Sequence, residues 1–363
     1  MSTFSEPPRF SEQAPFTVTT ASGHYAVSIG PGLAHVEVDA GRVDAVVADE
    51  RFVGLFDGVP VVTIEAAEEN KTLSGVEDVI VGLREVGVRR ADHVLVVGGG
   101  IVQDVGTLAC ALFMRGVEWS YAPTTLMAMV DSCIGGKSSI NARQLKNVIG
   151  NIYPPDRVVI DTEFTRTLAT IDLVSGLAEA VKICFCRGVD EFDEYLEIVP
   201  APVRPGADFG PVIGHSLRAK QWFIEIDEFD RAERQRLNFG HTFGHALEAA
   251  TDFRIPHGVA IAVGMIAACD FAGRPRATQR LRGHVLDLLH EVDGLGRTIG
   301  VVDWAKFRTA FDGDKKHRRG AYRLVLPNEG GVDVSDVPLN DQTLDEVEGA
   351  ARSALDETTG AST

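Results

Sequence analysis

The chain has 363 residues and a mass of 39.1 kDa, which is more than one hydrophobic core usually supports and predicts two domains. Its hydrophobic content of 45% and charged content of 24% are ordinary for a globular protein. The formal net charge of −17 argues against a general nucleic-acid binder or a protein that binds anionic membranes, because both need a basic surface. An anionic small substrate stays compatible, since a pocket can be locally positive.

The five cysteines and the first residues bear on the compartment of the protein. An odd number of cysteines without zinc-ribbon spacing predicts reduced thiols, which is typical of a cytoplasmic protein. The first ten residues, MSTFSEPPRF, do not place an apolar region after a basic one, so we expect no secretory signal. No apolar run reaches the roughly 18 residues that span a bilayer, so we expect no membrane partner.

Short β-branched runs alternate with helical stretches from Phe16 to about Ile160. This alternation predicts a mostly parallel, Rossmann-like sheet with helices on both faces. The expected strands are Tyr25–Ile29, Ala45–Val47, Val61–Ile64, His93–Val97 and Val158–Ile160, and the expected helices are Leu73–Glu85 and Gln103–Met114.

From about Arg166 the strand signals fade and amphipathic helical patterns dominate, interrupted by one strand-like run, Ala321–Leu326. We therefore expect an α/β domain over residues 1–165, followed by an all-α domain over residues 166–363. The expected helices are Ile171–Arg187, Glu191–Ile198, Phe209–Glu225, Arg231–Thr251, Val259–Ala272, Ala277–Val292, Trp304–Phe311 and Leu344–Leu355.

A glycine-rich strand end in the first half is typical of a phosphate-binding turn. In LVVGGGIVQDVG, residues 95–106, an apolar strand runs into three glycines and then a helix. Glycines let the backbone approach a pyrophosphate, and a helix N-terminus presents unpaired amides. The segment lacks the GxGxxG fingerprint because residue 103 is Gln, so a tight turn without a ligand is the alternative. Asp104 is a candidate nucleotide contact.

A second segment, PTTLMAMVDSCIGGKSSIN, residues 123–141, suits an anion such as a phosphate. Gly135 and Gly136 are expected to open a loop in which Lys137 supplies a point charge. The alternative is a solvated turn with a surface lysine. Further donors follow at Ser138, Ser139, Asn141, Lys146 and Asn147.

Three histidines and a glutamate in the second half point to a divalent metal. His241 and His245 stand four apart, so on a helix they share one face, with side-chain roots about 5–6 Å apart. His257 follows a proline-marked turn. Glu179, on an otherwise apolar helix, could complete a zinc set of one glutamate and two histidines with a position open for substrate oxygen. The alternatives are ordinary surface histidines and a salt bridge from Glu179 to Lys182.

Cationic and amide side chains precede the histidine pair, at Lys220, Arg234 and Asn238. Neutral imidazoles bind divalent metals, whereas ammonium, guanidinium and amide groups donate hydrogen bonds to anions. Their occurrence in one short stretch indicates a metal beside an anionic substrate.

Taken together, these segments resemble dehydroquinate synthase and the wider family of sugar phosphate cyclases. The matching blocks run from Gly98 to Lys316, about sixty per cent of the chain, with spacing that fits throughout. Each block alone is short, and the ordered set makes the resemblance specific. The blocks are GGGIVQD, FMRG, PTTLMAMVDSCIGGKSSIN, KNVIG, GLAEAVK, LNFGHTFGHALE, HGVAIAVGM and GDKK.

The resemblance implies an NAD-binding α/β domain followed by a helical domain, with NAD+ as cofactor. It also implies a divalent metal, usually zinc with cobalt as the alternative, bound by Glu179, His241 and His257. His245 is then not a ligand but a hydrogen-bonding or proton-transfer group. The residues implied for NAD are Asp49, near the adenosine ribose, and Glu68, Lys71, Gly98, Gly99, Gly100, Val102, Asp104, Thr124, Thr125, Lys146, Phe164 and Thr167.

The resemblance also implies which residues contact a sugar phosphate substrate. Lys137, Asn147 and one lysine of the Lys315–Lys316 pair, with Lys316 taken as the candidate, match the groups that hold the phosphate. Arg115 matches an arginine that reaches across a dimer interface, which predicts a homodimer. The remaining substrate contacts implied are Asp131, Lys182, Lys220, Arg234 and Asn238.

The reaction implied is that of a phosphate-eliminating carbon–oxygen lyase. A ring hydroxyl of a phosphorylated C7 sugar is oxidised transiently, phosphate leaves by β-elimination, the ketone is reduced again, and an aldol step closes a carbocycle. NAD+ is recycled, and zinc acts as a Lewis acid. Arg234 and Lys220 match the carboxylate-binding positions of dehydroquinate synthase. A buried cation pair without a carboxylate would be poorly satisfied, which favours a 3-deoxy-heptulosonate 7-phosphate or its amino analogue.

Two further hypotheses stay open. Several positions depart from the usual synthase text, including SCIGGKSSIN and Asp230, where a glutamate is usual. A specialised cyclase that converts sedoheptulose 7-phosphate to a valiolone-type cyclitol is therefore the alternative within the family. An NAD- and metal-dependent polyol dehydrogenase, which shares the domain plan, is the alternative from another class, although a simple alcohol offers no phosphate for Lys137 and Asn147 to bind.

Overall fold

The computed structural model describes residues 13–143 and 145–360, which form two compact units. Unit 1 comprises the chain up to Leu168 together with Gly206–Leu217, and unit 2 comprises Ala169–Pro205 and Arg218 onward. The predicted division between residues 165 and 166 assigned every later residue to the second domain. In the structure, Gly206–Leu217 belongs to unit 1 instead. The segment assessed for a secretory signal, MSTFSEPPRF, lies outside the described residues.

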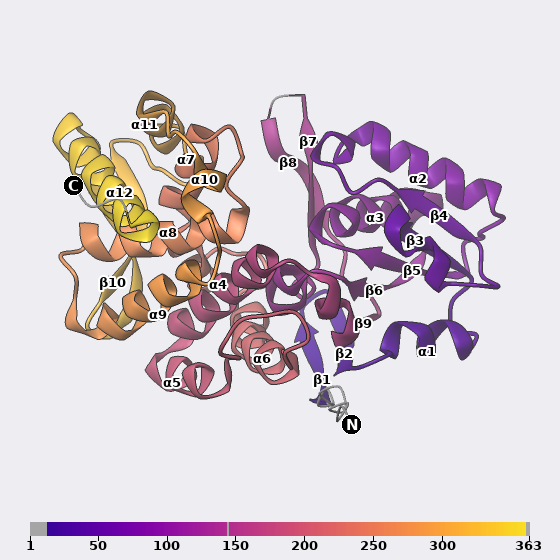
Figure 1. Cartoon of the computed structure of the whole chain (residues 1–363). Helices are drawn as coiled ribbons and strands as arrows, with labels where there is room; N and C mark the ends of the chain where they lie inside the picture. The colour runs from indigo at the N-terminus through magenta and orange to yellow at the C-terminus, as the bar shows by residue number, and fades with distance from the viewer. Residues whose placement is uncertain (1–12, 144, 361–363) are drawn as a thin grey trace, which may run out of the picture. The chain divides into compact units, whose positions relative to one another are not determined.

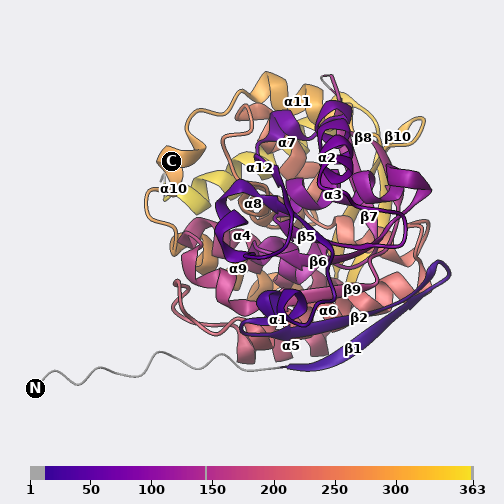
Figure 2. The ribbon, with the colours of Figure 1, turned by 90° about the vertical axis from the view of Figure 1, so that its right-hand side faces the viewer.

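Unit 1 is built on a seven-stranded sheet with the order β1-β2-β9-β6-β5-β3-β4. Six of these strands, from β2 to β4 across the sheet, run parallel, and β1 pairs antiparallel with β2 at one edge (Figure 2). The expected mostly parallel α/β fold is therefore confirmed, although β1 and β6 were not predicted. The strands are β1 (Gln13–Thr20), β2 (Gly23–Gly30), β3 (Ala45–Asp49), β4 (Val61–Ile64), β5 (His93–Gly98), β6 (Glu118–Pro123) and β9 (Arg157–Asp161).

Helices that connect strands of this sheet are α1 (Leu33–Asp39), α2 (Leu73–Glu85) and α3 (Gly100–Leu112). In Figure 1, α2 and α3 lie on one side of the sheet and α1 on the other. Right-handed crossovers produce this arrangement, because the chain leaves β2 in one direction along the sheet and leaves β4 and β5 in the other. Single helical turns, η1 (Glu50–Leu55), η2 (Glu68–Asn70), η3 (Phe113–Arg115), η4 (Ala128–Ser132) and η5 (Thr162–Thr167), complete the connections.

Strands β3 and β5 flank the topological switch point of the sheet. They are neighbours, yet the chain leaves β3 toward β4 and leaves β5 toward β6, in opposite directions. A crevice opens outside the carboxyl ends of such strands, and ligands bind there in doubly wound α/β proteins. Asp49 ends β3 and Gly98 ends β5, so two of the residues expected to contact NAD border the switch point.

The segment after Gly135 and Gly136 is a hairpin and not the loop that we expected. Both glycines have positive φ, 102° and 61°, after which Lys137 begins β7 (Lys137–Ala142), paired antiparallel with β8 (Leu145–Ile152). A side chain at residue 136 would come within 3.1 Å of the backbone of Pro154, which explains why glycine stands there. The donors Ser138 and Asn141 therefore stand on a strand.

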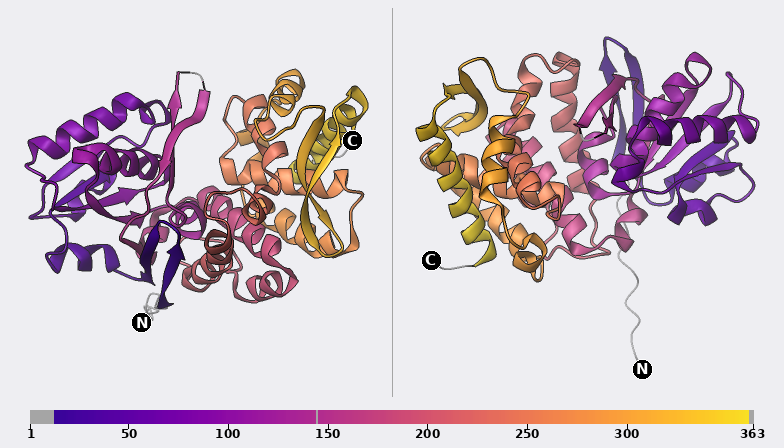
Figure 3. Two further views of the ribbon diagram at one scale, coloured as in Figure 1. Left: turned by 180° about the vertical axis from the view of Figure 1, so that it is seen from behind. Right: turned by 90° about the horizontal axis from the view of Figure 1, so that it is seen from above.

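Unit 2 is helical, as expected, and also contains an antiparallel hairpin whose second strand was not predicted (Figure 3). The predicted strand-like run forms its first strand. Helix α6 begins in unit 1 and ends in unit 2. The elements are α4 (Thr170–Arg187), α5 (Val189–Ile198), α6 (Gly210–Ile226), η6 (Glu233–Asn238), α7 (His241–Ala250), α8 (His257–Phe271), η7 (Arg276–Thr278), α9 (Gln279–His290), α10 (Leu295–Ile299), α11 (Trp304–Asp312), β10 (Ala321–Asn328), β11 (Gly331–Pro338) and α12 (Asp341–Thr359).

Helix α8 forms the centre of unit 2. It is apolar on all sides and buried over most of its length, which is the pattern of a helix surrounded by other elements. Glycines allow its neighbours to approach: a Cβ atom at Gly258 would lie 2.1 Å from the carbonyl oxygen of Ser175 in α4, and one at Gly264 would lie 2.2 Å from that of Gly240. These contacts bring α4 and α7 against α8.

The helix predicted over Arg231–Thr251 is wrong as a continuous element. The chain instead forms the turn η6 and then starts α7 after Gly240, whose φ is 77°. A side chain at this position would meet the carbonyl oxygen of Ile261 at 2.9 Å, so the sequence requires glycine and the helix cannot run through it. Arg234 and Asn238 therefore do not share a helix with His241.

The sequence predicted reduced cysteines and no membrane-spanning segment. All five cysteines are buried, and none of them forms a disulfide. Within residues 13–143 and 145–360, no helix combines the length and the apolar character needed to cross a bilayer.

Candidate active site

Unit 2 brings Glu179, His241 and His257 together from three helices. Glu179 lies in the middle of α4, whereas His241 and His257 are the first residues of α7 and α8. The Oε1 atom of Glu179 lies 3.8 Å from Nε2 of His241 and 3.7 Å from Nε2 of His257. The contacts of α8 with α4 and α7 thus converge on the three residues expected to bind a metal.

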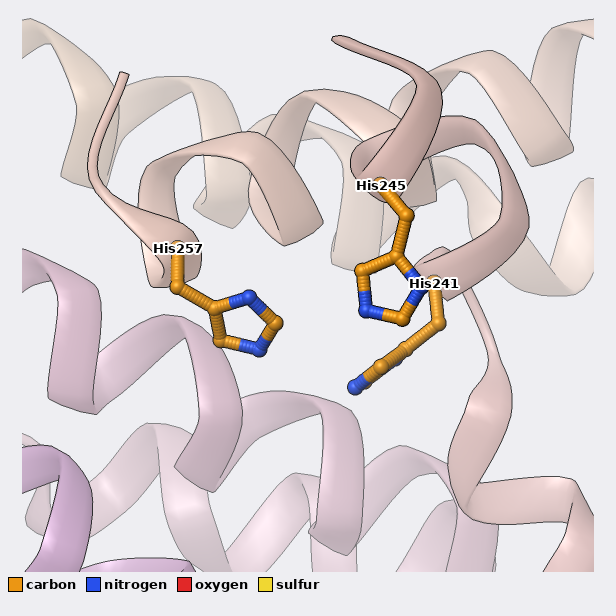
Figure 4. Close-up of side chains that lie close together, drawn as sticks. All are labelled: His241, His245 and His257. Atoms are coloured by element: carbon orange, nitrogen blue, oxygen red, sulfur yellow. The ribbon is translucent and has the colours of Figure 1, made fainter. Parts of the chain in front are cut away.

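His245 lies beside this group, one turn after His241 on α7. The ring centroids of the three histidines are 5.3, 5.6 and 5.7 Å apart, and Figure 4 shows the rings pointing toward one another. Ligand atoms of all three histidines fall within 4.8 Å of one another, so a set of three histidines is geometrically a second candidate.

The unsatisfied oxygen of Glu179 favours the first set over the three histidines. Its side chain is 1% exposed, and Oε1 has no hydrogen-bond partner among the residues that the structure describes. Four tetrahedral ligands at about 2.1 Å from a zinc ion are roughly 3.4 Å from one another, close to the two distances measured here. These two distances are compatible with a divalent cation shared by Glu179 and the two histidines, which would satisfy the buried oxygen.

Hydrogen bonds at the other ring nitrogens direct both Nε2 atoms toward Glu179. Nδ1 of His241 lies 3.2 Å from the carbonyl oxygen of Phe239, and Nδ1 of His257 lies 3.1 Å from Oε1 of Glu248. Both partners only accept hydrogen bonds when Glu248 is ionised, so each Nδ1 carries a proton, and in the neutral ring Nε2 offers a lone pair. Glu248 was missed in the sequence, although it stands seven residues after His241, on the same helical face.

Burial controls the protonation of the histidines. It lowers the pKa of His241 well below its usual value, with a further contribution from Lys182, and it lowers the pKa of His245 to about 4, helped by Lys316. Burial also disfavours charge on His257, but the hydrogen bond to Glu248 outweighs it and raises the pKa of His257. Neutral His241 and His245 are the forms that accept a metal or a proton.

Two lysines, Lys182 and Lys316, interact with Glu179 and the histidines. Lys182, 2% exposed, forms an ion pair with the Oε2 atom of Glu179 one turn earlier on α4. Lys316 donates to Oδ2 of Asp314 at 2.6 Å, and its charge acts on both His241 and His245. This electrostatic influence distinguishes Lys316 from Lys315 as the cation next to the histidines.

Of the other expected substrate contacts of unit 2, Lys220 and Arg234 are buried and Asn238 is partly buried. Lys220 and Arg234 are each 5% exposed. Arg234 donates from Nη1 to the carbonyl oxygen of Glu228 at 2.7 Å, and Nδ2 of Asn238 donates to the carbonyl oxygen of Gln235 at 3.0 Å. These bonds of Arg234 and Asn238 stay within their own segment, so they do not link the two residues directly to the histidines.

In unit 1, the glycine turn lies at the end of β5 and the start of α3. A Cβ atom at Gly98 would lie 2.5 Å from that of Val102, and one at Gly99 would lie 2.9 Å from the side chain of Thr125, whereas nothing described lies within 4 Å of such an atom at Gly100. The first two glycines are needed for packing and the third leaves the backbone open. This arrangement, at a helix N-terminus beside the switch point, fits a dinucleotide phosphate.

Of the other residues expected to contact the nucleotide, Thr124 is bonded to this turn, and Asp49, Phe164 and Thr167 belong to neighbouring segments of unit 1. Asp49 accepts hydrogen bonds from the Arg51 side chain at 3.0 and 3.1 Å, so an arginine that the sequence analysis did not consider holds its carboxylate. The rings of Phe52 and Phe164 are in contact, with centroids 5.1 Å apart, which places η5 next to η1. Thr124 donates its backbone N–H to Gly98 at 3.0 Å, and Thr167 ends η5.

A polar network joins α3 to the hairpin β7–β8. Nζ of Lys71 lies 2.7 Å from Oδ2 of Asp104 and donates to Oδ1 of Asn147 at 2.8 Å. The backbone N–H of Ser139 donates to Oδ1 of Asp104 at 2.8 Å. Burial raises the pKa of Asp104, although Lys71 acts against this shift. Hydrogen bonds within unit 1 thus connect Lys71 and Asp104, which are expected to contact NAD, with Asn147, which is expected to contact the phosphate.

The network continues through Asn141, which the sequence analysis counted among the phosphate donors. Its Nδ2 group donates to Oε1 of Glu68 at 2.9 Å, and its Oδ1 atom accepts the backbone N–H of Asn147 at 3.0 Å. Lys146 lies 3.4 Å from the same glutamate oxygen. The amide of Asn141 therefore holds the hairpin in place.

Three other expected residues occupy separate places in unit 1. Lys137 is exposed at the start of β7. Arg115, also exposed, follows Met114 in η3, and both have positive φ, at 71° and 49°. Asp131 belongs to the π-helical turn η4.

Comparison with protein families identifies relatives of the chain. The family model described as 3-dehydroquinate synthase N-terminal matches residues 61–175, and the one described as 3-dehydroquinate synthase C-terminal matches residues 176–317, together more than half of the chain. The 3-dehydroquinate synthase of Streptococcus sanguinis strain SK36 is 33% identical over 312 residues, which cover 82% of this chain and 87% of that protein.

Solved structures share the fold. A 2-deoxy-scyllo-inosose synthase complexed with carbaglucose-6-phosphate, NAD+ and Co2+ matches with a TM-score of 0.78 and 24% identity, over 92% of this chain and 99% of that one. The 2-epi-5-epi-valiolone synthase of Streptomyces hygroscopicus subsp. jinggangensis 5008, solved with NAD+ and Zn2+, matches with a TM-score of 0.73 and 28% identity, over 91% of this chain and 96% of that one.

Proposed function

The chain belongs to the dehydroquinate synthase family of sugar phosphate cyclases, and on this premise we propose that it converts a phosphorylated C7 sugar into a carbocycle with loss of phosphate. The observation that carries the proposal is the buried, unsatisfied Oε1 atom of Glu179, which faces Nε2 of His241 and of His257. One carboxylate and two neutral imidazoles suit a divalent cation, Zn2+ or Co2+.

The glycine turn Gly98–Gly100 and Asp49, which flank the switch point, would hold the cofactor in unit 1. When bound, NAD+ would accept and return a hydride and the cation would polarise substrate oxygens as a Lewis acid. The chain itself contributes binding and orientation: the pair Lys71–Asp104 stays buried beside the turn, and Glu179 keeps Lys182 in place on α4.

Lys137 and Asn147 of unit 1 would bind the substrate phosphate, because an ammonium group and an amide N–H match its negative oxygens. Lys316 of unit 2 stays a candidate for the same role by resemblance alone. Two donors support this role for Asn147. Lys71 and the hydroxyl of Ser139 both donate to its Oδ1 atom, at 2.8 and 3.3 Å, which leaves the Nδ2 group to donate elsewhere. His245 would form a hydrogen bond with the substrate or exchange a proton with it.

The substrate that we favour is a 3-deoxy-heptulosonate 7-phosphate, which carries a carboxylate. Lys220 and Arg234, both buried, match the carboxylate-binding positions of dehydroquinate synthase, and a substrate carboxylate would be a complementary anion for two cations. The 33% identity to a 3-dehydroquinate synthase supports this choice. Sedoheptulose 7-phosphate is the second candidate, because the chain is also 28% identical to a 2-epi-5-epi-valiolone synthase.

A substrate panel tests the reaction class and the substrate together. The protein, loaded with NAD+ and Zn2+, is incubated with each C7 sugar phosphate and with glycerol, and inorganic phosphate, NADH absorbance and product mass are followed. We expect stoichiometric phosphate, a carbocyclic product and no accumulated NADH with one sugar phosphate. Accumulated NADH without phosphate, obtained with glycerol, would instead identify a polyol dehydrogenase.

Arg234→Ala tests the carboxylate. It should weaken the transition-state stabilisation of a carboxylate substrate by about 1.5–3 kcal/mol, the range for a hydrogen bond to a charged group. Arg236→Ala, in the same segment but paired with Glu233 at 3.1 Å near the surface, is the matched control and should change little. Equal kcat/KM for the Arg234 variant and the wild type would remove the carboxylate argument.

We also propose a homodimer in which Arg115 reaches the partner subunit. The exposure of the Arg115 side chain supports this role, because a partner subunit could reach it. Light scattering measures the mass in solution. A monomer at micromolar concentration would contradict the proposal, whereas a dimer that Arg115→Ala weakens would support it.

A further inference from the structure

Glu248 connects two of the helices that carry the cluster. It lies near the end of α7, and its Oε1 atom accepts a hydrogen bond from Nδ1 of His257, the first residue of α8, at 3.1 Å. Its side chain is mostly buried, with 15% exposed. The backbone carbonyl of Glu248 also accepts the N–H of Phe253 at 2.8 Å, so the turn between the two helices closes on the same residue.

The bond determines which nitrogen of His257 is available. A neutral imidazole can carry its proton on either nitrogen, and only the unprotonated one can bind a cation. Because an ionised carboxylate accepts hydrogen bonds and donates none, the proton of His257 must lie on Nδ1. The lone pair of Nε2 then faces Oε1 of Glu179, 3.7 Å away.

His241 provides an internal comparison. Its Nδ1 atom has the same role toward the backbone carbonyl of Phe239, which is a neutral acceptor that no side-chain substitution removes. His257 has a charged acceptor that comes from a side chain. A carboxylate makes an imidazole a stronger electron-pair donor than a carbonyl does, so the two ligands differ in strength and in how easily they can be altered.

We propose that Glu248 is a positioning residue that fixes the tautomer and ring orientation of His257 and thereby strengthens divalent-cation binding by Glu179, His241 and His257. The inference rests on the metal role of these three residues in the proposed function. The carboxylate does not contact the cation itself. It supplies a second negative charge next to the site, where the first, on Glu179, is already paired with Lys182.

The test measures Zn2+ affinity of the full-length protein after removal of metal by a chelator, by competition with a chromophoric chelator. Glu248→Gln keeps the size and a neutral acceptor and removes the charge. We expect it to bind Zn2+ roughly 10- to 100-fold more weakly. The visible spectrum of the Co2+-loaded variant should also shift, since the donor strength of His257 changes. Glu197→Gln, which removes an exposed charge from α5, is the matched control and should bind Zn2+ as the wild type does.

The outcomes separate this inference from the proposal on which it rests. Zn2+ affinity of Glu248→Gln within twofold of the wild type, with affinity lost in His257→Ala, would overturn the role of Glu248 alone. Unchanged affinity in His257→Ala as well would overturn the metal site. NAD+ binding and the melting temperature of the metal-free protein report folding. If Glu248→Gln melts at a lower temperature, Glu248→Asp decides: recovered affinity supports the inference and an equal loss overturns it.

Discussion

The polar network of unit 1 and the histidine cluster of unit 2 each contain buried charged groups, but they satisfy these charges in different ways. In unit 1, Lys71 lies between Asp104 and Asn147, so its charge has partners within the protein. In unit 2, one oxygen of Glu179 is paired with Lys182, while the other, without a hydrogen bond among the described residues, faces the Nε2 atoms of His241 and His257. The first arrangement is complete by itself. The second leaves one carboxylate oxygen that the proposed divalent cation would satisfy.

Removal of Glu179 should produce the largest effect and tests the cluster directly. In Glu179→Gln we expect Zn2+ affinity to fall by more than the roughly 100-fold that an outer-sphere change can cause, because a ligand is lost. Metal-free protein should also lose roughly 3–5 kcal/mol of unfolding free energy, since Lys182 stays buried without its counter-ion. Metal analysis and urea unfolding measure the two losses.

A double variant separates the ligand from the ion pair. Glu179→Gln combined with Lys182→Met should recover stability but not Zn2+ affinity, because no buried charge is left over while the carboxylate ligand is still absent. Recovery of both properties would contradict the assignment of Glu179 to the metal.

Disruption of the unit 1 network should have a smaller effect and no influence on metal. Lys71→Met leaves Asp104 without its cation and Asn147 without its donor, and we expect a loss of about 2–3 kcal/mol of unfolding free energy. Zn2+ affinity should not change. The double variant Lys71→Met with Asp104→Asn should lose less than the sum of the single variants, because the two residues are coupled. Strict additivity in urea unfolding would show that the pair is not coupled.

The smallest effect is expected at Asp227, whose network is more exposed than the other two. Burial raises the pKa of Asp227, but the backbone N–H groups of Arg231, Ala232 and Arg234 outweigh it and lower the pKa below its usual value. A carboxylate with a depressed pKa in the folded state stabilises the protein above its unfolded pKa, near pH 4, and this stabilisation disappears as the pH falls through the folded value.

Asp227→Asn should therefore cost less than about 1 kcal/mol at pH 7, because solvent screens the exposed carboxylate. The difference from the wild type should shrink as the pH is lowered to about 3. Urea unfolding at several pH values measures it. A difference that grows toward acid pH would mean that the hydrogen bonds to Asp227 do not favour its charged form.

Several elements could be predicted because local chemistry determines them. Helix α2 has the predicted bounds, Leu73–Glu85, because an amphipathic pattern follows Thr72, whose hydroxyl accepts the N–H of Gly75 at 3.3 Å. Strands β3 to β5 were recognised by their β-branched runs. Strand β6 was missed, since Trp119, Ser120 and Tyr121 are buried but do not form such a run.

The features that could not be predicted depend on contacts between distant segments. The break at Gly240 follows from the approach of α8, which no pattern within residues 231–251 reveals. The spacing of His241 and Glu248 shows a common helical face but not that Glu248 contacts His257 on the next helix. The metal role of Glu179, His241 and His257 came from the resemblance and stays a prediction, for which the orphaned oxygen of Glu179 is independent support.

The glycine contacts of α8 have a consequence for how this catalyst can diversify. Ser175 and Gly240 touch the α8 backbone so closely that even a methyl group at Gly258 or Gly264 would force the helices apart. The three helices that carry Glu179, His241 and His257 are therefore packed with their backbones in close contact, so a displacement of one helix affects the others. Substitutions that alter the function while preserving this frame are therefore expected at residues that do not take part in these backbone contacts.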